Sequence, residues 1–375
     1  MRTEFLVLAA ALLAAGGALA QSSTATGVSR DFNPAISVNT LLLGRIAANT
    51  TDGDYNGIDL QESEVQFTSI VDPYWKANLV FAVHPAHGDG EEHGGYAGDV
   101  EVATIAGQAV PGGFGLLVGK DYLPFGKHVP LHTHQFPFVD APAAVVAFLG
   151  DHALSETGVR LSHDLPLPWY SDLTAYGVDG SSELFAAESR DLAWGARWSN
   201  VVDLSFESTL ELGGSWLHGP AAADYLESGG GQVDVWGADL TWKWVSAAAS
   251  KGPALTVTGE LILPRPADSG AEPWGWYALA QYRFRRAWWL GLGTGALDRA
   301  LPAHADDGAE DEHAHGLLAW DEAREYKANL TWVPSEFSAI RLEVAHYDDV
   351  LGDDDDTLYS LQFNFTIGSH PAHLY

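Results

Sequence analysis

A period-two alternation of apolar and polar residues, repeated along most of the chain, is the feature that most constrains its fold. Clear examples are residues 204–212, 255–261 and 359–367. In each segment one side is aliphatic or aromatic, and the other carries Ser, Thr, Gln, Asn or Glu. Because successive side chains of a strand point to opposite faces, this pattern predicts either a half-buried soluble sheet or a membrane barrel with a wet interior.

The connections between the predicted strands separate these two interpretations. The alternation predicts strands over residues 36–48, 60–71, 74–84, 99–109, 113–121, 155–163, 170–178, 190–199, 202–216, 231–245, 253–264, 274–285, 287–298, 323–333, 336–347 and 357–367. Short connections follow the second, fourth, eighth, twelfth and fourteenth strands, and the eighth is expected to turn at Asn200 and Val201. Most of the others are long, polar and acidic. This alternation of loop lengths predicts an all-β, porin-like transmembrane antiparallel barrel of about 16 strands without a plug domain.

Tryptophan placement also favours the membrane barrel. Trp75, Trp198, Trp244, Trp289 and Trp332 fall at predicted strand ends beside short turns. An indole ring prefers the headgroup level of a bilayer, so these five residues predict one interfacial girdle. A soluble β-protein would instead scatter them through its core.

The first twenty residues have the composition of a secretory signal peptide. Arg2 precedes an apolar run over residues 5–15, and Ala18-Leu19-Ala20 forms a cleavage site before Gln21. The run is too short to span a bilayer, although an N-terminal anchor helix is the alternative. We expect a signal peptide over residues 1–20, a periplasmic N-terminal segment over 21–33, and a barrel over 34–375 in the outer membrane of a Gram-negative bacterium.

Composition and motifs exclude several function classes. The chain has 50 acidic and 19 basic residues, a net charge of −31, which excludes a nucleic-acid binder. Because it has no Cys, disulfides, thiolate zinc sites and cysteine nucleophiles are excluded. The sequence contains no G-x-S-x-G, H-E-x-x-H or phosphate-loop motif. We therefore expect no enzyme and assign no catalytic residue, with an outer-membrane hydrolase barrel as an alternative.

The polar side of the alternation predicts the walls of a pore. The expected pore-lining residues are Glu62, Glu64, Glu101, Glu207, Glu211, Asp239, Glu260, Glu343 and Arg341. The basic residues on the same side are Arg45, Lys76, Arg197 and Lys243. The balance is negative and predicts a cation-preferring pore, unless these charges pair across strands. The connection from Asp121 to Leu154 contains an apolar stretch over 143–149 and is expected to fold inward and narrow this pore.

Histidines cluster with acidic residues in segments expected on the outside. The candidate metal ligands are His84, His87, Glu91, Glu92, His93, His132, His134, His304, Asp311, Glu312, His313 and His315. Neutral imidazole with carboxylate suits Zn²⁺ or a similar divalent metal. The prediction is metal capture on flexible loops with no tightly bound cofactor, and ordinary solvated acidic loops are the alternative.

Several motifs resemble those of a family of Gram-negative outer-membrane barrels. The resembling pieces are residues 32–38, 70–74, 119–126, 132–140 and 368–375. The family is often labelled zinc-regulated, TonB-dependent outer-membrane receptors. A TonB-dependent receptor has a plug and about 22 strands, and residues 21–32 leave no room for a plug.

The combined prediction is a porin-like channel for small solutes, cation-preferring, with outside loops that gather zinc or a similar metal. Its expected partners are outer-membrane lipid, small cations or metal, and the barrel assembly machinery, with a homotrimer as the candidate assembly. A non-conducting surface-binding barrel is the alternative from another class.

Overall fold

The computed structural model describes residues 34–48, 56–85, 95–108, 110–150, 154–186, 191–222, 225, 231–247, 252–267, 272–299, 322–348 and 356–368. The strands are β1 (Ala35–Ala47), β2 (Gly57–Asp72), β3 (Trp75–Pro85), β4 (Tyr96–Gly107), β5 (Phe114–Tyr122), β6 (Ser155–Asp164), β7 (Tyr170–Val178), β8 (Ala193–Ser205), β9 (Ser208–Pro220), β10 (Gln232–Val245), β11 (Ala254–Pro266), β12 (Trp274–Arg285), β13 (Trp288–Asp298), β14 (Glu322–Ser335), β15 (Ser338–Asp348) and β16 (Asp356–Gly368). The helical elements are η3 (Pro111–Gly113), η4 (Thr133–Gln135) and α3 (Ala143–Leu149). Among the described residues, no helix has the length and hydropathy needed to cross a membrane. The predicted signal peptide and residues 21–33 lie outside the described residues.

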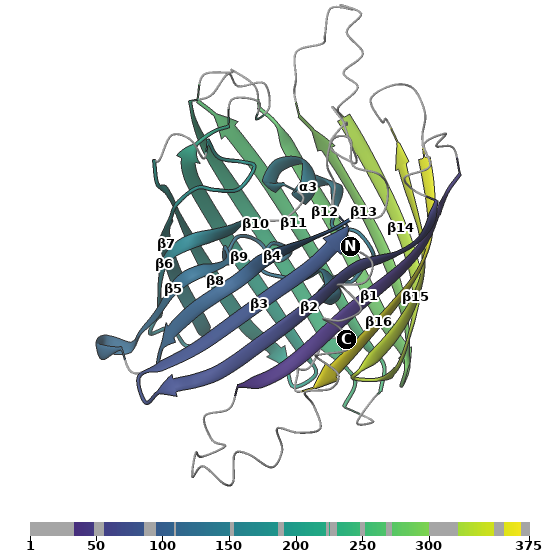
Figure 1. The fold of residues 1–375 in the computed structure, drawn as a ribbon, viewed down its shortest axis with the longest axis horizontal. Coiled ribbons are helices and arrows are strands. Elements are labelled where there is room, and N and C mark those ends of the chain that lie inside the picture. The colour runs from purple at the N-terminus through teal and green to yellow at the C-terminus, as the bar shows by residue number, and fades with distance from the viewer. Residues whose placement is uncertain are drawn as a thin grey trace, which may run out of the picture.

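The sixteen strands form a closed ring. Each strand pairs antiparallel with its neighbours in the chain, and β1 pairs with β16 to complete the barrel (Figure 1). The closing register places Ser37 opposite Gly368. Closure leaves no strand edge unpaired, which a sheet in hydrocarbon requires. The predicted antiparallel barrel of sixteen strands is confirmed.

Connections differ between the two ends of the barrel. At one end β2–β3, β8–β9, β12–β13 and β14–β15 are joined by tight turns of two residues each. The β4–β5, β6–β7 and β10–β11 connections at this end have five to eight residues. At the other end every connection has seven residues or more, and the one from β5 to β6 covers residues 123–154. The predicted alternation of short and long connections is therefore confirmed, and it is the pattern of an outer-membrane barrel.

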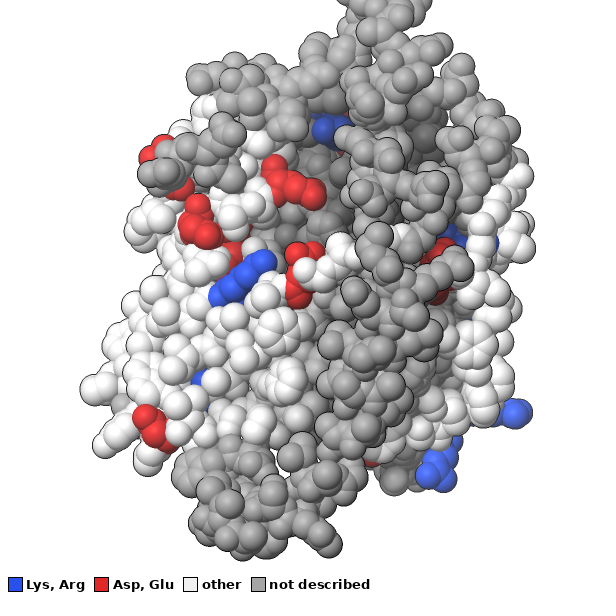
Figure 2. All heavy atoms as spheres, viewed as in Figure 1, with Lys and Arg blue, Asp and Glu red and all other residues white. Residues whose placement is uncertain are grey.

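The barrel has an apolar outside and a polar inside. On β16, Phe363 and Phe365 are 42% and 39% exposed, whereas Gln362 and Asn364 are 3% and 8% exposed. A water-soluble protein would bury these aromatics, so their exposure identifies a lipid-facing surface. Figure 2 shows few charged side chains on the described wall, which is mostly white.

The turn between β8 and β9 differs from the prediction. Strand β8 continues through Asn200 and Val201, and the chain reverses at Phe206 and Glu207. Glu207 was predicted to line the pore, and this is wrong, because its carboxylate accepts a hydrogen bond from the backbone N–H of Ala247 in the adjacent turn at 2.6 Å. The error arose because the apolar residues Leu204, Phe206 and Leu210 keep an even spacing on both sides of the turn.

The tryptophan girdle is only partly as predicted. Trp332 lies beside the β14–β15 turn, 39% exposed, with its ring centroid 6.3 Å from that of Trp288. Trp289 instead is 8% exposed and lies inside the barrel, where the Arg283 guanidinium is 5.3 Å from its ring centroid. Trp198 lies mid-strand, because β8 extends to Ser205. The prediction is thus wrong at Trp289 and Trp198.

Candidate functional site

The connection from β5 to β6, called the inner loop below (residues 123–154), folds into the barrel. The backbone N–H of Leu123 donates to the carbonyl of Leu154 at 2.8 Å and closes the base of this loop. Phe125, Phe138 and Phe148 are at most 2% exposed and share one packed core with inward residues of the strands. Figure 1 shows α3 within the ring of strands. The predicted inward fold of this connection is confirmed.

Helix α3 fills one side of the barrel interior. Six of its seven residues are buried, and it packs against β11, β12, β13 and β14. The close approach depends on Gly275, where an added Cβ would lie 2.7 Å from Phe148 and 2.8 Å from Ala144. Inward apolar residues such as Ile262 and Leu297 receive the helix, so this sector of the wall is dry.

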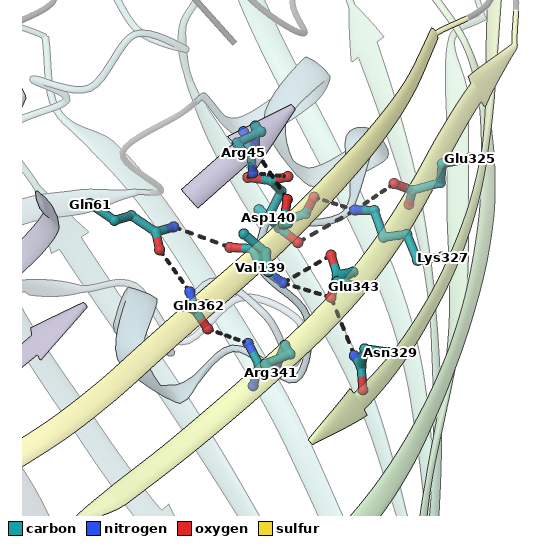
Figure 3. Close-up of polar contacts among 12 residues, drawn as sticks. Arg45, Gln61, Val139, Asp140, Glu325, Lys327, Asn329, Arg341, Glu343 and Gln362 are labelled. Carbon is teal, nitrogen blue, oxygen red and sulfur yellow. Dashed lines mark hydrogen bonds and ion pairs between the residues drawn. The ribbon is translucent and has the colours of Figure 1, made fainter. Parts of the chain in front are cut away.

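Ion pairs attach the inner loop to β1 and β14 (Figure 3). Arg45 on β1 donates to both carboxylate oxygens of Asp140 at 2.7 Å. Lys327 on β14 donates to the carbonyl of Ala141 at 2.9 Å and pairs with Glu325 at 2.8 Å. Burial alone would raise the pKa of Asp140, but the Arg45 and Lys327 charges outweigh burial and lower the pKa below its ordinary value. The carboxylate therefore stays charged at neutral pH and holds the loop.

A second set of contacts attaches the loop to β14 and β15 (Figure 3). The Glu343 carboxylate accepts hydrogen bonds from the backbone N–H of Val139 at 3.1 and 3.0 Å. Asn329 donates to the carbonyl of Pro137 at 3.1 Å, and Arg341 donates to the carbonyl of Phe136 at 2.9 Å. Glu343 is 1% exposed and Arg341 is 6% exposed. These two predicted pore-lining residues therefore bind the loop backbone under cover of the loop.

The start of the loop is held on the opposite wall. Gly126 donates its backbone N–H to Ser215 Oγ at 3.1 Å, and Lys127 donates its own to Glu260 Oε2 at 2.9 Å. Tyr277 donates to the same Glu260 oxygen at 2.6 Å. Gly126 has φ +58, and an added Cβ would collide with the Glu260 carboxylate. Only glycine fits this close approach. The loop is therefore held at residues 126–127 on one wall and at residues 136–141 on the other, and it spans the lumen between them.

The histidines of the inner loop lie inside the barrel, beside carboxylates of the wall. His132 Nδ1 is 3.0 Å from Glu101 Oε2, and His134 Nδ1 is 3.0 Å from Glu64 Oε1. Burial would lower the pKa of His132, but its hydrogen bonds to Glu101 and Glu64 outweigh burial and raise the pKa to about 10. The structure thus brings two predicted metal ligands together with two predicted pore residues.

A cavity of about 510 Å³ lies between the inner loop and the wall formed by β8 to β13. The loop contributes Lys127 and Leu131, and the wall contributes polar residues such as Thr256, Thr258 and Gln281. Strands β11 to β13 contact both features: α3 packs near Ile262, Gly275 and Leu297, toward the long-connection end of these strands. The cavity lies toward their other end, at residues such as Thr256, Gln281 and Trp289.

Charged residues around this cavity are mainly basic. Among the described residues that line it, Lys127, Arg197, Lys243 and Arg283 are basic and Glu211 is acidic. The Glu211 carboxylate pairs with the Lys127 ammonium at 2.5 Å and with that of Lys243 at 2.6 Å. One acidic residue is therefore shared between two basic ones, and the cavity carries a positive balance.

The acidic residues expected to line the pore are mostly covered. Arg197 forms two hydrogen bonds to Asp239, whose side chain is 0% exposed. The members of the predicted set that are at most 8% exposed are Glu62, Glu64, Asp239, Glu260, Arg341 and Glu343. Because these side chains are buried, the negative pore wall expected from the sequence does not form at the cavity.

The outside histidine loops are largely beyond the described residues. His84 is described, and its Nε2 lies 2.8 Å from Asp99 Oδ2. The other outside candidates lie outside the described residues: His87, Glu91, Glu92, His93, His304, Asp311, Glu312, His313 and His315. A shared outside metal site that includes His132 and His134 is not the arrangement seen, because those two side chains face Glu64 and Glu101 within the barrel.

Comparison with known proteins places this geometry in a fold family. No family model matches the chain. An uncharacterized protein of Aquifex aeolicus (strain VF5) is 26% identical over 351 residues, which cover 84% of this chain and 70% of that protein. Salmonella typhi OmpF in complex with daunomycin superposes with a TM-score of 0.57 at 10% identity, covering 91% of this chain and 99% of OmpF. The fold is that of a porin-like outer-membrane barrel.

Two further porin-like structures agree. The outer-membrane channel DcaP of Acinetobacter baumannii has a TM-score of 0.53 at 12% identity, over 89% of this chain and 96% of DcaP. The anion-selective porin from Comamonas acidovorans has a TM-score of 0.55 at 11% identity, over 89% and 98% of the two chains. The predicted location in the outer membrane of a Gram-negative bacterium agrees with this likeness of fold. The label of TonB-dependent receptor is not supported, since the part of the chain that the structure describes contains no plug domain.

Several important residues were absent from the sequence prediction. Glu325, Lys327 and Asn329 lie on the inward side of a strand whose outward side carries Tyr326 and Leu330. Period-two parity alone would have placed all three inside the barrel. Asp140 and Lys127 carry no comparable signal, because their partners come from strands distant in the sequence.

Proposed function

We propose that this porin-like barrel is a diffusion channel for small polar solutes across the outer membrane. The observation that carries the proposal is the cavity of about 510 Å³, whose lining includes several charged and polar side chains, beside a loop fixed to both sides of the lumen. A channel and an anion-selective porin are among the proteins of similar fold, which supports the proposal. The proposed path of the solutes runs through this cavity.

The charge preference that the cavity supports differs from the sequence prediction of a cation-preferring pore. That prediction counted carboxylates that are covered, such as Glu64 and Glu343. A solute in the cavity instead meets Lys127, Lys243 and Arg283 with Glu211 as the acidic residue among the lining. We therefore propose that the channel favours small anions and neutral polar solutes.

Replacing Lys243 by Gln is expected to move the reversal potential in a KCl gradient toward cation preference. A unit charge about 8 Å from an ion in water changes the energy of the ion by about 0.5 kcal/mol, with opposite signs for an anion and a cation, so removing one should lower the anion-to-cation permeability ratio about fivefold. The shift should grow at low salt, where screening is weaker. Planar-bilayer recording of the purified barrel measures it.

Glu207→Gln is the matched control, because Glu207 lies in a tight turn and should leave the reversal potential unchanged. A wild-type reversal potential on the cation side would contradict the anion preference and favour the sequence prediction. A folded barrel without conductance would contradict the channel itself and favour the non-conducting surface-binding barrel.

Metal capture by the outside loops and trimer formation stay predictions from the sequence. The supporting feature for the first is the His- and acid-rich composition of residues 84–93 and 304–315. Most of these residues lie outside the described ones.

A further inference from the structure

Five metal-ligand side chains meet on the side of the inner loop that faces β2 and β4. Glu62 and Glu64 come from β2, Glu101 from β4, and His132 and His134 from the loop. The ligand atoms of Glu62, Glu64 and His134 all lie within 4.8 Å of one another, and so do those of Glu64, Glu101 and His132. His132 Nδ1 is also 3.3 Å from Glu64 Oε2. Glu64 belongs to both groups and is therefore the centre of the cluster.

The strands are locally distorted to build this cluster. In β4 a bulge leaves Glu101 as the extra residue opposite β3, and in β2 a bulge leaves Gln61 as the extra residue opposite β1. A bulge re-aims side chains and is enriched beside functional sites. Two bulges next to one group of carboxylates indicate that the backbone is shaped to converge these ligands.

One carboxylate oxygen of Glu62 lacks a hydrogen-bond partner among the described residues and could instead bind a cation. Glu62 is 8% exposed, and its Oε2 accepts a hydrogen bond from Thr133 Oγ1 at 2.9 Å. Its Oε1 is buried and has no hydrogen-bond partner within the described part of the chain. A buried carboxylate oxygen without a partner is costly, and a bound cation would satisfy it.

We propose that Glu62, Glu64, Glu101, His132 and His134 form a binding site for a divalent transition-metal ion of the Zn²⁺ type inside the barrel. Imidazole nitrogen with carboxylate oxygen is a ligand set that suits Zn²⁺, whereas Ca²⁺ and Mg²⁺ favour oxygen ligands throughout. Each imidazole would coordinate the ion through a ring nitrogen that carries no proton. These ligands would bind the metal whether or not the barrel conducts.

The position of the ligands gives this site a structural consequence. Two ligands belong to the inner loop and three to the wall, so a bound ion fastens the loop to β2 and β4. The ion pair of Arg45 with Asp140 fastens the same loop elsewhere. The metal would therefore add a further attachment and fix the width of the cavity on the other side of the loop.

Zinc titration of the full-length barrel in detergent tests this site directly. Isothermal titration at pH 7.5 is compared for the wild type, Glu64→Gln and His132→Ala/His134→Ala. Each variant should bind one zinc ion fewer per chain than the wild type, or should bind one of its zinc ions at least tenfold more weakly. Co²⁺ bound to the wild type should give visible absorption bands of a nitrogen- and oxygen-ligated ion, which both variants lose.

Two control variants separate a metal site from other causes. Arg45→Gln removes a loop anchor but no ligand, and it should keep zinc stoichiometry and the Co²⁺ spectrum. His84→Ala removes a histidine outside this site and should leave zinc binding and the Co²⁺ spectrum of this site unchanged. Heat-modifiability on gels verifies that each variant is a folded barrel. Unchanged zinc stoichiometry, affinity and Co²⁺ spectrum in a folded His132→Ala/His134→Ala protein would overturn the proposal, and the cluster would then be a hydrogen-bonded fastening only.

Discussion

Excision of the inner loop is expected to raise single-channel conductance about twofold or more, because a barrel of sixteen strands without an internal loop leaves a wide aqueous lumen. Replacing residues 125–152 by a short Gly/Ser linker removes α3 and the loop side of the cavity. The strand pairing at the base, where Tyr122 lies opposite Ser155, is retained. Planar-bilayer recording measures the change.

Arg45→Gln is the graded comparison for loop excision. This variant breaks the bidentate contact with Asp140 but leaves the Glu343 and Lys327 contacts, so its conductance should rise far less. Equal conductance in the wild type and the excised protein would show that the loop does not restrict the permeation path.

Deletion of residues 356–375 is expected to abolish the folded barrel. The deletion removes β16, which pairs with both β1 and β15, and leaves two unpaired strand edges in hydrocarbon. Each unsatisfied backbone group there costs several kcal/mol, so closure cannot be replaced by local rearrangement. The measurement is the heat-modifiable band on gels together with outer-membrane fractionation.

A shorter truncation controls for loss of chain length. Removing residues 369–375 keeps β16 whole and should leave assembly intact. A normal heat-modifiable band after removal of residues 356–375 would contradict the closing role of β16.

The barrel could be predicted because its determinants are local. The alternation along each strand, the loop lengths and the number of strands can all be read from the sequence. All three agree with one structure, a barrel with lipid outside and water inside. The wrong prediction of the turn between β8 and β9 also has a local cause. Phe206 and Glu207 continue the alternation through a tight turn, so period alone could not locate the reversal.

The interior of the barrel could be predicted only in part. The apolar residues 143–149 indicated that the loop turns inward, because they need a dry surface to pack against. Which carboxylates face the solute could not be predicted, since Glu343 is covered by Val139 and Asp239 by Arg197. These partners are far apart in sequence and meet only when the barrel closes around the loop.

Thiol modification of single-cysteine variants tests most directly that the cavity is the permeation path. The chain has no Cys, so Gln281→Cys and Tyr282→Cys each introduce a single thiol. Gln281 lines the cavity, and its neighbour Tyr282 is 39% exposed on the outer face of the same strand. A charged methanethiosulfonate reagent should reduce the conductance of Gln281→Cys and leave that of Tyr282→Cys unchanged. Unchanged conductance of a fully modified Gln281→Cys protein would contradict the account.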